Sequence, residues 1–193
     1  MEEKLNILYK ECVEELKNIG IDVLNKEIVG NIEIHLSKRN NKRYGCCKQE
    51  EPDQKSKYIE KSGRRKILRY AKFNKHVIEI SPWVMELEDE IIKNTIVHEI
   101  IHCMPFCNNH GELFKKYAQY INTKLGYNIS RVGNKAEDYK KSNKTYEEDK
   151  NYKYKIKCQN CGQEIYRKRF NKKLLYKYRC GKCNGRLKLV EVY

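Results

Sequence analysis

One short stretch of the sequence decides the fold: residues 98–110 read HEIIHCMPFCNNH. His98 and His102 are four residues apart, a spacing that on a helix puts both imidazoles on one face, one turn apart. Glu99 lies beside them, where a general base is needed. His110 follows in the returning segment and supplies a third ligand. Three protein ligands plus water are typical of a catalytic zinc ion, because the fourth position stays open.

The segment before this motif has the pattern of a helix. Ile92, Ile96 and Ile100 recur at helical spacing. Acidic residues gather at the start of the segment, where they suit the positive end of the helix dipole. We therefore expect one helix from about residue 86 to residue 104, ended by Pro105. Structural context of this kind separates a metal motif from a chance match to the same pattern.

Three other side chains near the motif are alternatives to His110 as the third ligand, namely Cys103, Cys107 and Glu112. Cys103 directly follows His102 on the expected helix and would point away from the metal. Glu112 lies two residues beyond His110. We favour His110 because a ligand needs both the right chemical type and sufficient reach.

A second metal motif lies near the C-terminus. Cys158 and Cys161 form one Cys-x-x-Cys pair, Cys180 and Cys183 form another, and eighteen residues separate the pairs. This spacing is typical of a zinc ribbon, and four thiolates leave no open position, so the zinc ion would be structural. Two disulfides or a redox pair would use the same cysteines. Nothing in the sequence indicates secretion, so we favour zinc.

The length and composition predict two domains. A chain of 193 residues holds one medium and one small domain. We place the domain that carries the histidine motif at residues 1–132 and the four-cysteine zinc ribbon at residues 152–193. The segment between them, residues 133–151, is charged and poor in apolar residues, and is therefore predicted to be a flexible linker.

The net charge of +15 is distributed unevenly. Residues 151–193 carry 13 basic and 2 acidic residues, whereas the rest of the chain carries 28 and 24. Tyrosines are interleaved with the basic residues of this tail, a combination typical of nucleic-acid-binding surfaces. We therefore expect the ribbon to bind DNA, and the nearly neutral remainder to attract DNA only weakly.

The sequence predicts a cytoplasmic protein, including a pool at the nucleoid. The first residues are charged and amphipathic, unlike a signal peptide, and no stretch approaches the apolar length of a membrane span. Nine cysteines fit a reducing compartment in which thiols bind metals. The five outside the ribbon are expected to be mostly small apolar core residues: Cys12, Cys46, Cys47, Cys103 and Cys107.

The remaining elements follow from hydrophobic periodicity. We expect helices at residues 2–19 and after His110 up to Gly126, strands at 31–36, 44–48 and within 67–80, and a charged surface loop at 50–65. His35 and His76 fall in predicted strands, and a lone strand histidine is more often a surface or core residue than a ligand. The fold class is therefore α+β.

The order of these motifs resembles the SprT-like zinc metallopeptidases, the SprT/Spartan-like family of zincins. The resemblance rests on the His98–His102 motif, on His110-Gly111 followed by Phe114, and on the C-terminal ribbon, and it covers nearly the whole chain from residue 2. Upstream, Tyr44-Gly45-Cys46-Cys47 and Ile78-Glu79-Ile80-Ser81-Pro82 resemble the strands of that family. The resemblance implies a minimal zincin core and action on DNA-associated proteins.

The chemistry that these residues predict is peptide hydrolysis. Zinc bound by three neutral imidazoles lowers the pKa of its water to about 7. Glu99 takes the proton and later delivers it to the leaving amine. The alternative is a catalytically weak or inactive zinc protein that binds nucleic acid. Glu99 favours the enzyme, since an inactive descendant has no reason to retain the base.

Overall fold

The computed structural model describes residues 1–39, 42–146 and 152–192, which form two compact units. Met1–Tyr146 form the first unit and Glu147–Tyr193 the second. Residues 133–146 of the predicted linker are part of the first unit and include helix α5 (Lys135–Lys141), so the prediction of a flexible segment is wrong there. The rest of that predicted linker, residues 147–151, lies outside the described residues.

A three-stranded sheet organises the first unit. Its order is β1 (Asn31–Leu36), β5 (Phe73–Ile80) and β2 (Gly45–Pro52), with β1 parallel and β2 antiparallel to the central β5. One face is solvated and carries charged side chains, including a Lys48–Glu79 ion pair of 2.5 Å. The other face is covered by helices, the common arrangement for a sheet with antiparallel pairing.

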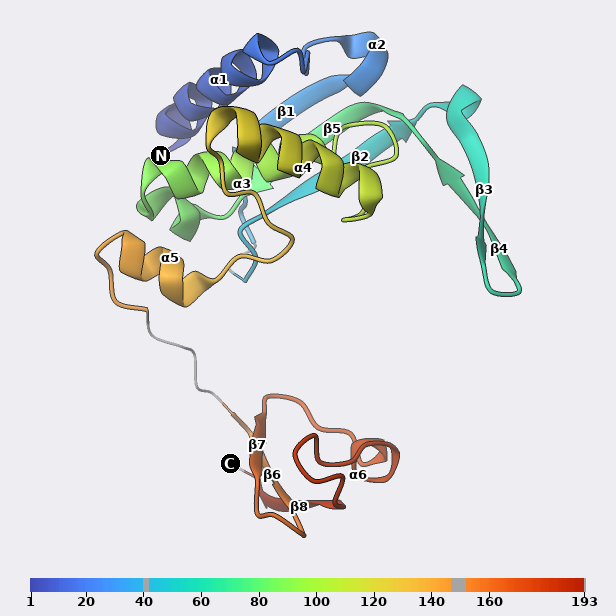
Figure 1. The fold of residues 1–193 in the computed structure, drawn as a ribbon, viewed down its shortest axis with the longest axis vertical. Coiled ribbons are helices and arrows are strands. Elements are labelled where there is room, and N and C mark those ends of the chain that lie inside the picture. Colours follow the sequence, from blue (N-terminus) through green and yellow to red (C-terminus); the bar gives the residue numbers. More distant parts are fainter. Residues whose placement is uncertain (40–41, 147–151, 193) are drawn as a thin grey trace. The chain divides into compact units, whose positions relative to one another are not determined.

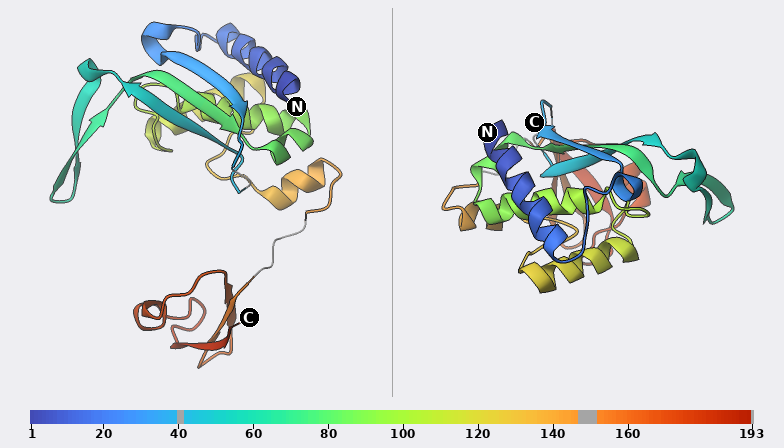
Figure 2. Two further views of the ribbon diagram at one scale, coloured as in Figure 1. Left: turned by 180° about the vertical axis from the view of Figure 1, so that it is seen from behind. Right: turned by 90° about the horizontal axis from the view of Figure 1, so that it is seen from above.

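Helices α1 (Glu2–Asn18) and α3 (Asp89–Ile101) pack on the inner face of this sheet, and α4 (Glu112–Leu125) packs against α3 (Figures 1 and 2). The short helix α2 (Lys26–Val29) lies before β1. α1 and α4 both match the predicted helices, and Gly126 ends α4 in the left-handed conformation. The apolar faces of these helices form one core with β5, and three of the five cysteines outside the ribbon, Cys12, Cys103 and Cys107, belong to it. Cys46 is buried outside this core, and Cys47 packs against the core partly buried.

The motif helix is shorter than predicted. A 3-10 helix, η2 (Pro82–Glu86), precedes it, and α3 begins only at Asp89. At the other end α3 stops at Ile101, before Pro105. Pro82 begins η2 because its fixed φ suits the first turn of a helix. The predicted single helix over 86–104 is therefore divided in the structure.

Residues 50–65 are not the predicted surface loop. β2 continues to Pro52, a short turn follows, and β3 (Lys57–Ser62) pairs with β4 (Arg65–Tyr70) as an antiparallel hairpin. Figure 1 shows this hairpin extending away from the body of the unit, and Figure 2 shows the same from two other directions. None of its described side chains is fully buried, and its sequence lacks the apolar alternation that is typical of a strand in a core.

The second unit is a small sheet with one short helix. The strand order is β7 (Glu164–Arg167), β6 (Tyr154–Cys158) and β8 (Leu187–Val192), and α6 (Lys173–Lys177) lies between the two cysteine pairs. Ile156 and Leu187 pack beside Cys158 and Cys180 to form its buried centre. Across both units, none of the described helices is long and apolar enough to span a bilayer.

Gly30 gives a direct test of how the sheet is joined to the helices. It has φ +70 and ψ −158 between α2 and β1, and a Cβ there would lie 2.4 Å from the backbone oxygen of Asn74. We expect Gly30→Ala to lower the free energy of unfolding by about 3 kcal/mol, through strain and overpacking.

The control is Gly20→Ala, because Gly20 has φ +85 but no atom near its absent Cβ. That change should cost only about 1 kcal/mol. Urea unfolding followed by the fluorescence of Trp83, the single tryptophan, reports on the first unit. Equal losses for the two variants would contradict the steric argument.

Candidate active site and metal centres

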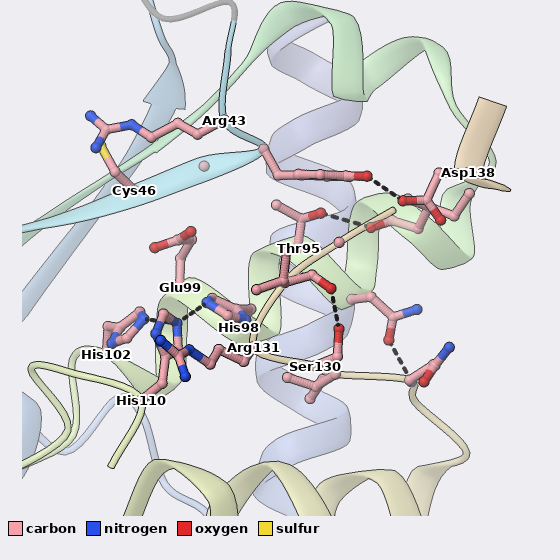
Figure 3. A pocket seen from close by; sticks show the side chains of 18 of the residues that line it. Arg43, Cys46, Thr95, His98, Glu99, His102, His110, Ser130, Arg131 and Asp138 are labelled. Atoms are coloured by element: carbon pink, nitrogen blue, oxygen red, sulfur yellow. Dashed lines mark hydrogen bonds between the residues drawn. The ribbon is translucent and has the colours of Figure 1, made fainter. Parts of the chain in front are cut away.

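The structure brings the three predicted histidines together. His98 lies in α3, His102 caps the C-terminal end of that helix, and His110 precedes α4. The Nε2 atom of His110 lies 3.0 Å from that of His98 and 3.2 Å from that of His102. Figure 3 shows the three rings converging. Nitrogens of a tetrahedral zinc site lie about 3.3 Å apart, given zinc–nitrogen bonds of about 2.0–2.1 Å, so the group fits this metal.

Backbone and aromatic contacts hold the imidazoles in this arrangement. Nδ1 of His102 donates to the carbonyl oxygen of Cys107 at 2.7 Å, which leaves Nε2 free to bind a metal. The backbone of Ser130 hydrogen-bonds to His98. Phe114 of α4 lies under all three rings, with centroid distances of 4.7–4.9 Å. The third histidine is thus positioned by α4 as well as by its own loop.

The histidines are set up to be neutral. Burial and, to a smaller extent, the neighbouring imidazoles of His102 and His110 lower the pKa of His98 to about 4. Burial also lowers the pKa values of His102 and His110, and the positive charge of Arg131 adds to this effect at His110. A neutral imidazole keeps the lone pair that a metal requires, so the group is ready to bind a cation near pH 7.

Glu99 is 6% exposed and lies beside the imidazoles on the side of β2 (Figure 3). Burial raises the pKa of its carboxyl group to about 7, while Arg43 and a hydrogen bond from the backbone of Cys47 act in the opposite direction. Gly45 leaves space for the side chain of Glu99, because a Cβ atom at residue 45 would lie 3.0 Å from both Cγ and Oε1 of Glu99. Strand β2 therefore both holds the carboxylate and leaves room for it.

A cavity of about 820 Å³ opens over this group. β2 forms one side, and the segment after α4 together with α5 forms another. α5 is fixed there by a 2.5 Å hydrogen bond from the Tyr44 hydroxyl to Asp138 and by stacking of Tyr139 on Trp83. A cavity of this size suits an extended segment of a larger substrate as well as a small molecule.

The alternative third ligands lie elsewhere. Cys103 is buried, with its sulfur 3.6 Å from that of Cys47, and Cys107 is buried in the core. Glu112 is exposed and pairs with Lys115 at 2.7 Å. Among the described residues, only the three histidines and the four ribbon cysteines form groups that could hold a metal ion.

The sequence did not indicate Arg43, Arg131 or the backbone contacts from Cys47 and Ser130. Arg43 lies at the entry to β2, and Arg131 lies in the segment after α4. Both line the cavity only because the fold brings these segments to α3. No local pattern marks them, and only the tertiary arrangement reveals their place.

The four ribbon cysteines also converge. Sulfur atoms of Cys158 and Cys183 lie 3.4 Å apart, and those of Cys161 and Cys180 lie 3.6 Å apart. A disulfide bond is about 2.05 Å long, whereas sulfurs on one tetrahedral zinc ion lie about 3.8 Å apart. Hydrogen bonds from the backbone N–H groups of Cys161 and Asn160 lower the pKa of the Cys158 thiol. The donors therefore fit a closed zinc site.

Comparison with known proteins agrees with this geometry. The sequence model of the SprT-like family matches residues 13–133, and the chain belongs to this family. Two proteins named "Protein SprT-like", from two strains of Staphylococcus epidermidis, are each 32% identical over 142 residues. That alignment covers 70% of this chain and 80% of each relative. No solved structure matches the chain.

The packing of Phe114 against the histidines predicts a specific loss. We expect Phe114→Leu to weaken zinc binding at the histidine group at least tenfold, since supports of metal ligands commonly have effects of about 10–100-fold. Zinc competition with a fluorescent chelator measures the affinity, and cobalt absorption spectra separate the nitrogen site from the sulfur site.

The matched control is Ile121→Val, because Ile121 is equally buried on α4 but has no ring to support the imidazoles. This variant should keep wild-type zinc affinity while losing about 1 kcal/mol of stability. Equal zinc affinities of the two variants would contradict the inference that Phe114 supports the histidines.

Proposed function

We propose that the protein is a zinc metallopeptidase with one catalytic and one structural zinc ion. Membership of the SprT-like family and the three-histidine group indicate a metal-dependent hydrolase. The observation that carries the finer proposal is the buried carboxylate of Glu99 beside three converging, neutral imidazoles. Three nitrogen ligands leave one metal position open, and the general base lies next to it.

His98, His102 and His110 would hold the catalytic ion. When bound, zinc supplies an activated water and polarises the scissile carbonyl. Glu99 receives the proton from this water and passes it to the leaving amine. The hydrogen bond from Cys47 keeps the carboxylate on the cavity side of α3 during both transfers. Arg131, beside His110, adds positive charge at the wall of the cavity.

An extended peptide is the substrate that this cavity suits best. β2 pairs with β5 on one side, and no described strand pairs with its other edge. Gly45, Cys46 and Cys47 of this strand line the cavity. A free strand edge accepts an extended peptide through backbone hydrogen bonds, which favours protein substrates over small amides.

We further propose that the second unit binds DNA and so directs the enzyme to DNA-associated proteins, in the reducing interior of the cell. The support is the charge of residues 151–193 together with exposed aromatic rings. On and after α6, Tyr176 is 80% exposed and Tyr178 is exposed as well, beside the exposed Lys173 and Lys177. Bases stack on such rings without sequence preference.

Replacing the general base tests the enzyme directly. Glu99→Gln should retain two zinc ions per chain and reduce cleavage of a fluorescent casein at least 100-fold, as expected for loss of a general base. Glu90→Gln is the control, since Glu90 lies in the same helix and lines the same cavity. Wild-type cleavage by Glu99→Gln would exclude this role, and loss of zinc would make Glu99 a ligand.

Removing charge from α6 tests the DNA proposal. Changing Lys172, Lys173 and Lys177 together to Gln should weaken binding to a fluorescent single-stranded oligonucleotide. The slope of log K against the logarithm of the salt concentration should also become less steep by about 2, because each phosphate contact contributes about 0.7 to this slope. The control changes Lys10, Lys17 and Lys124 to Gln; these lysines are exposed in the first unit. Equal slopes for both variants would indicate that α6 does not contact DNA.

A further inference from the structure

The β3–β4 hairpin forms an arm, defined as residues 57–70, and none of its described residues belongs to the hydrophobic core of the first unit. It extends from the first unit in all three views (Figures 1 and 2). Ile59 and Leu68 face each other across the two strands and are 62% and 56% exposed. Exposed apolar residues on an isolated ribbon contribute little to stability, because a two-stranded hairpin is only marginally stable by itself.

The charge of the first unit is concentrated on this arm. Residues 57–70 carry six basic residues and one acidic residue, Glu60, which pairs with Arg69 at 2.9 Å. The other residues of the first unit, Met1–Tyr146, carry 21 basic and 20 acidic side chains. The arm therefore carries +5 of the net charge of +6 of the first unit.

The strand register distributes these cations over both faces and the tip. Lys57, Lys61 and Lys66 share one face with Ile59, Leu68 and Tyr70, because alternate residues of paired strands point the same way. Arg65 and Arg69 lie on the opposite face, and Arg64 lies in the two-residue turn with Gly63. Both faces of the arm and its turn therefore carry basic side chains, of which Arg69 is paired with Glu60.

We infer that the arm binds nucleic acid by entering a groove of a duplex. The major groove of DNA is about 12 Å wide and admits a two-stranded β-ribbon. Phosphates line both walls of a groove, which complements cations on both faces of the arm. An anionic membrane would instead meet one face, and it would not use cations on the other. Ile59 and Leu68 then contact sugars or thymine methyl groups at the groove floor.

The base of the arm is attached next to the histidine group. The backbone N–H of Phe106, between His102 and His110, donates to the carbonyl of Ala71 at 3.0 Å. The ring of Phe106 also contacts Tyr58, with centroids 5.4 Å apart. A duplex held by the arm would therefore lie near the cavity. This goes beyond the proposed function, because it assigns a nucleic-acid surface to the first unit and does not require peptidase activity.

The test uses the full chain carrying Glu99→Gln, so that binding is measured without cleavage. Lys57, Lys61 and Lys66 are changed together to Gln, and the affinity for a fluorescent DNA duplex is measured over a salt series. The salt dependence of log K should fall by about 2–3, since each lost phosphate contact removes about 0.9. The matched control again changes Lys10, Lys17 and Lys124 to Gln and should leave the slope unchanged.

Photocrosslinking locates the contact. A photoreactive amino acid replacing Ile59 should crosslink to the duplex, whereas one replacing Ile7, which is also exposed but lies on α1, should not. Unchanged fluorescence of Trp83 shows that each variant is folded. An unchanged salt slope in the arm variant would overturn the proposal, and so would an equal decrease of the slope in the control variant. The proposal is also overturned if the arm variant loses binding to phosphatidylserine vesicles but binds the duplex as the unmodified arm does.

Discussion

The burial of α3 on nearly all sides is the constraint on which the site depends. Ile92, Ile96 and Ile100 pack into the core, and Thr95 and Glu99 are buried on the adjacent side of the helix. A helix enclosed in this way cannot rotate without exposing apolar surface, at about 25 cal/mol per Å². Its fixed orientation presents the first two histidines and the carboxylate to the cavity, and β2 and α4 then add their contacts around a stationary element.

Local patterns made much of this site predictable. The spacing of His98 and His102 and of the paired cysteines predicts the two groups that the structure brings together, and Gly126 correctly marks the end of α4. The arm was missed because strand recognition assumes one buried face, and Ile59 and Leu68 lie exposed among charges. The place of α5 was missed as well, since it depends on stacking with residues far away in the sequence.

The two candidate metal groups differ in what the surrounding protein can do without a metal. The histidine group lies on a unit with an extended apolar core, so that unit has its own source of stability. Among the described residues of the second unit, the buried apolar centre consists of Ile156, Leu187, Cys158 and Cys180 alone. A domain this small usually needs a metal or disulfide crosslink to fold. Zinc depletion should therefore unfold the second unit while leaving the first one folded.

The attachment of Phe106 to Ala71 has a mechanical consequence. Each strand of the arm has six residues, so the arm is a lever about 20 Å long. The base of this arm is attached by the hydrogen bond between Ala71 and Phe106, in the loop that leads to His110. A force applied at the tip of the arm would act on this loop over the full length of the arm. A pull on the arm would thus change the position of one of the three converging histidines.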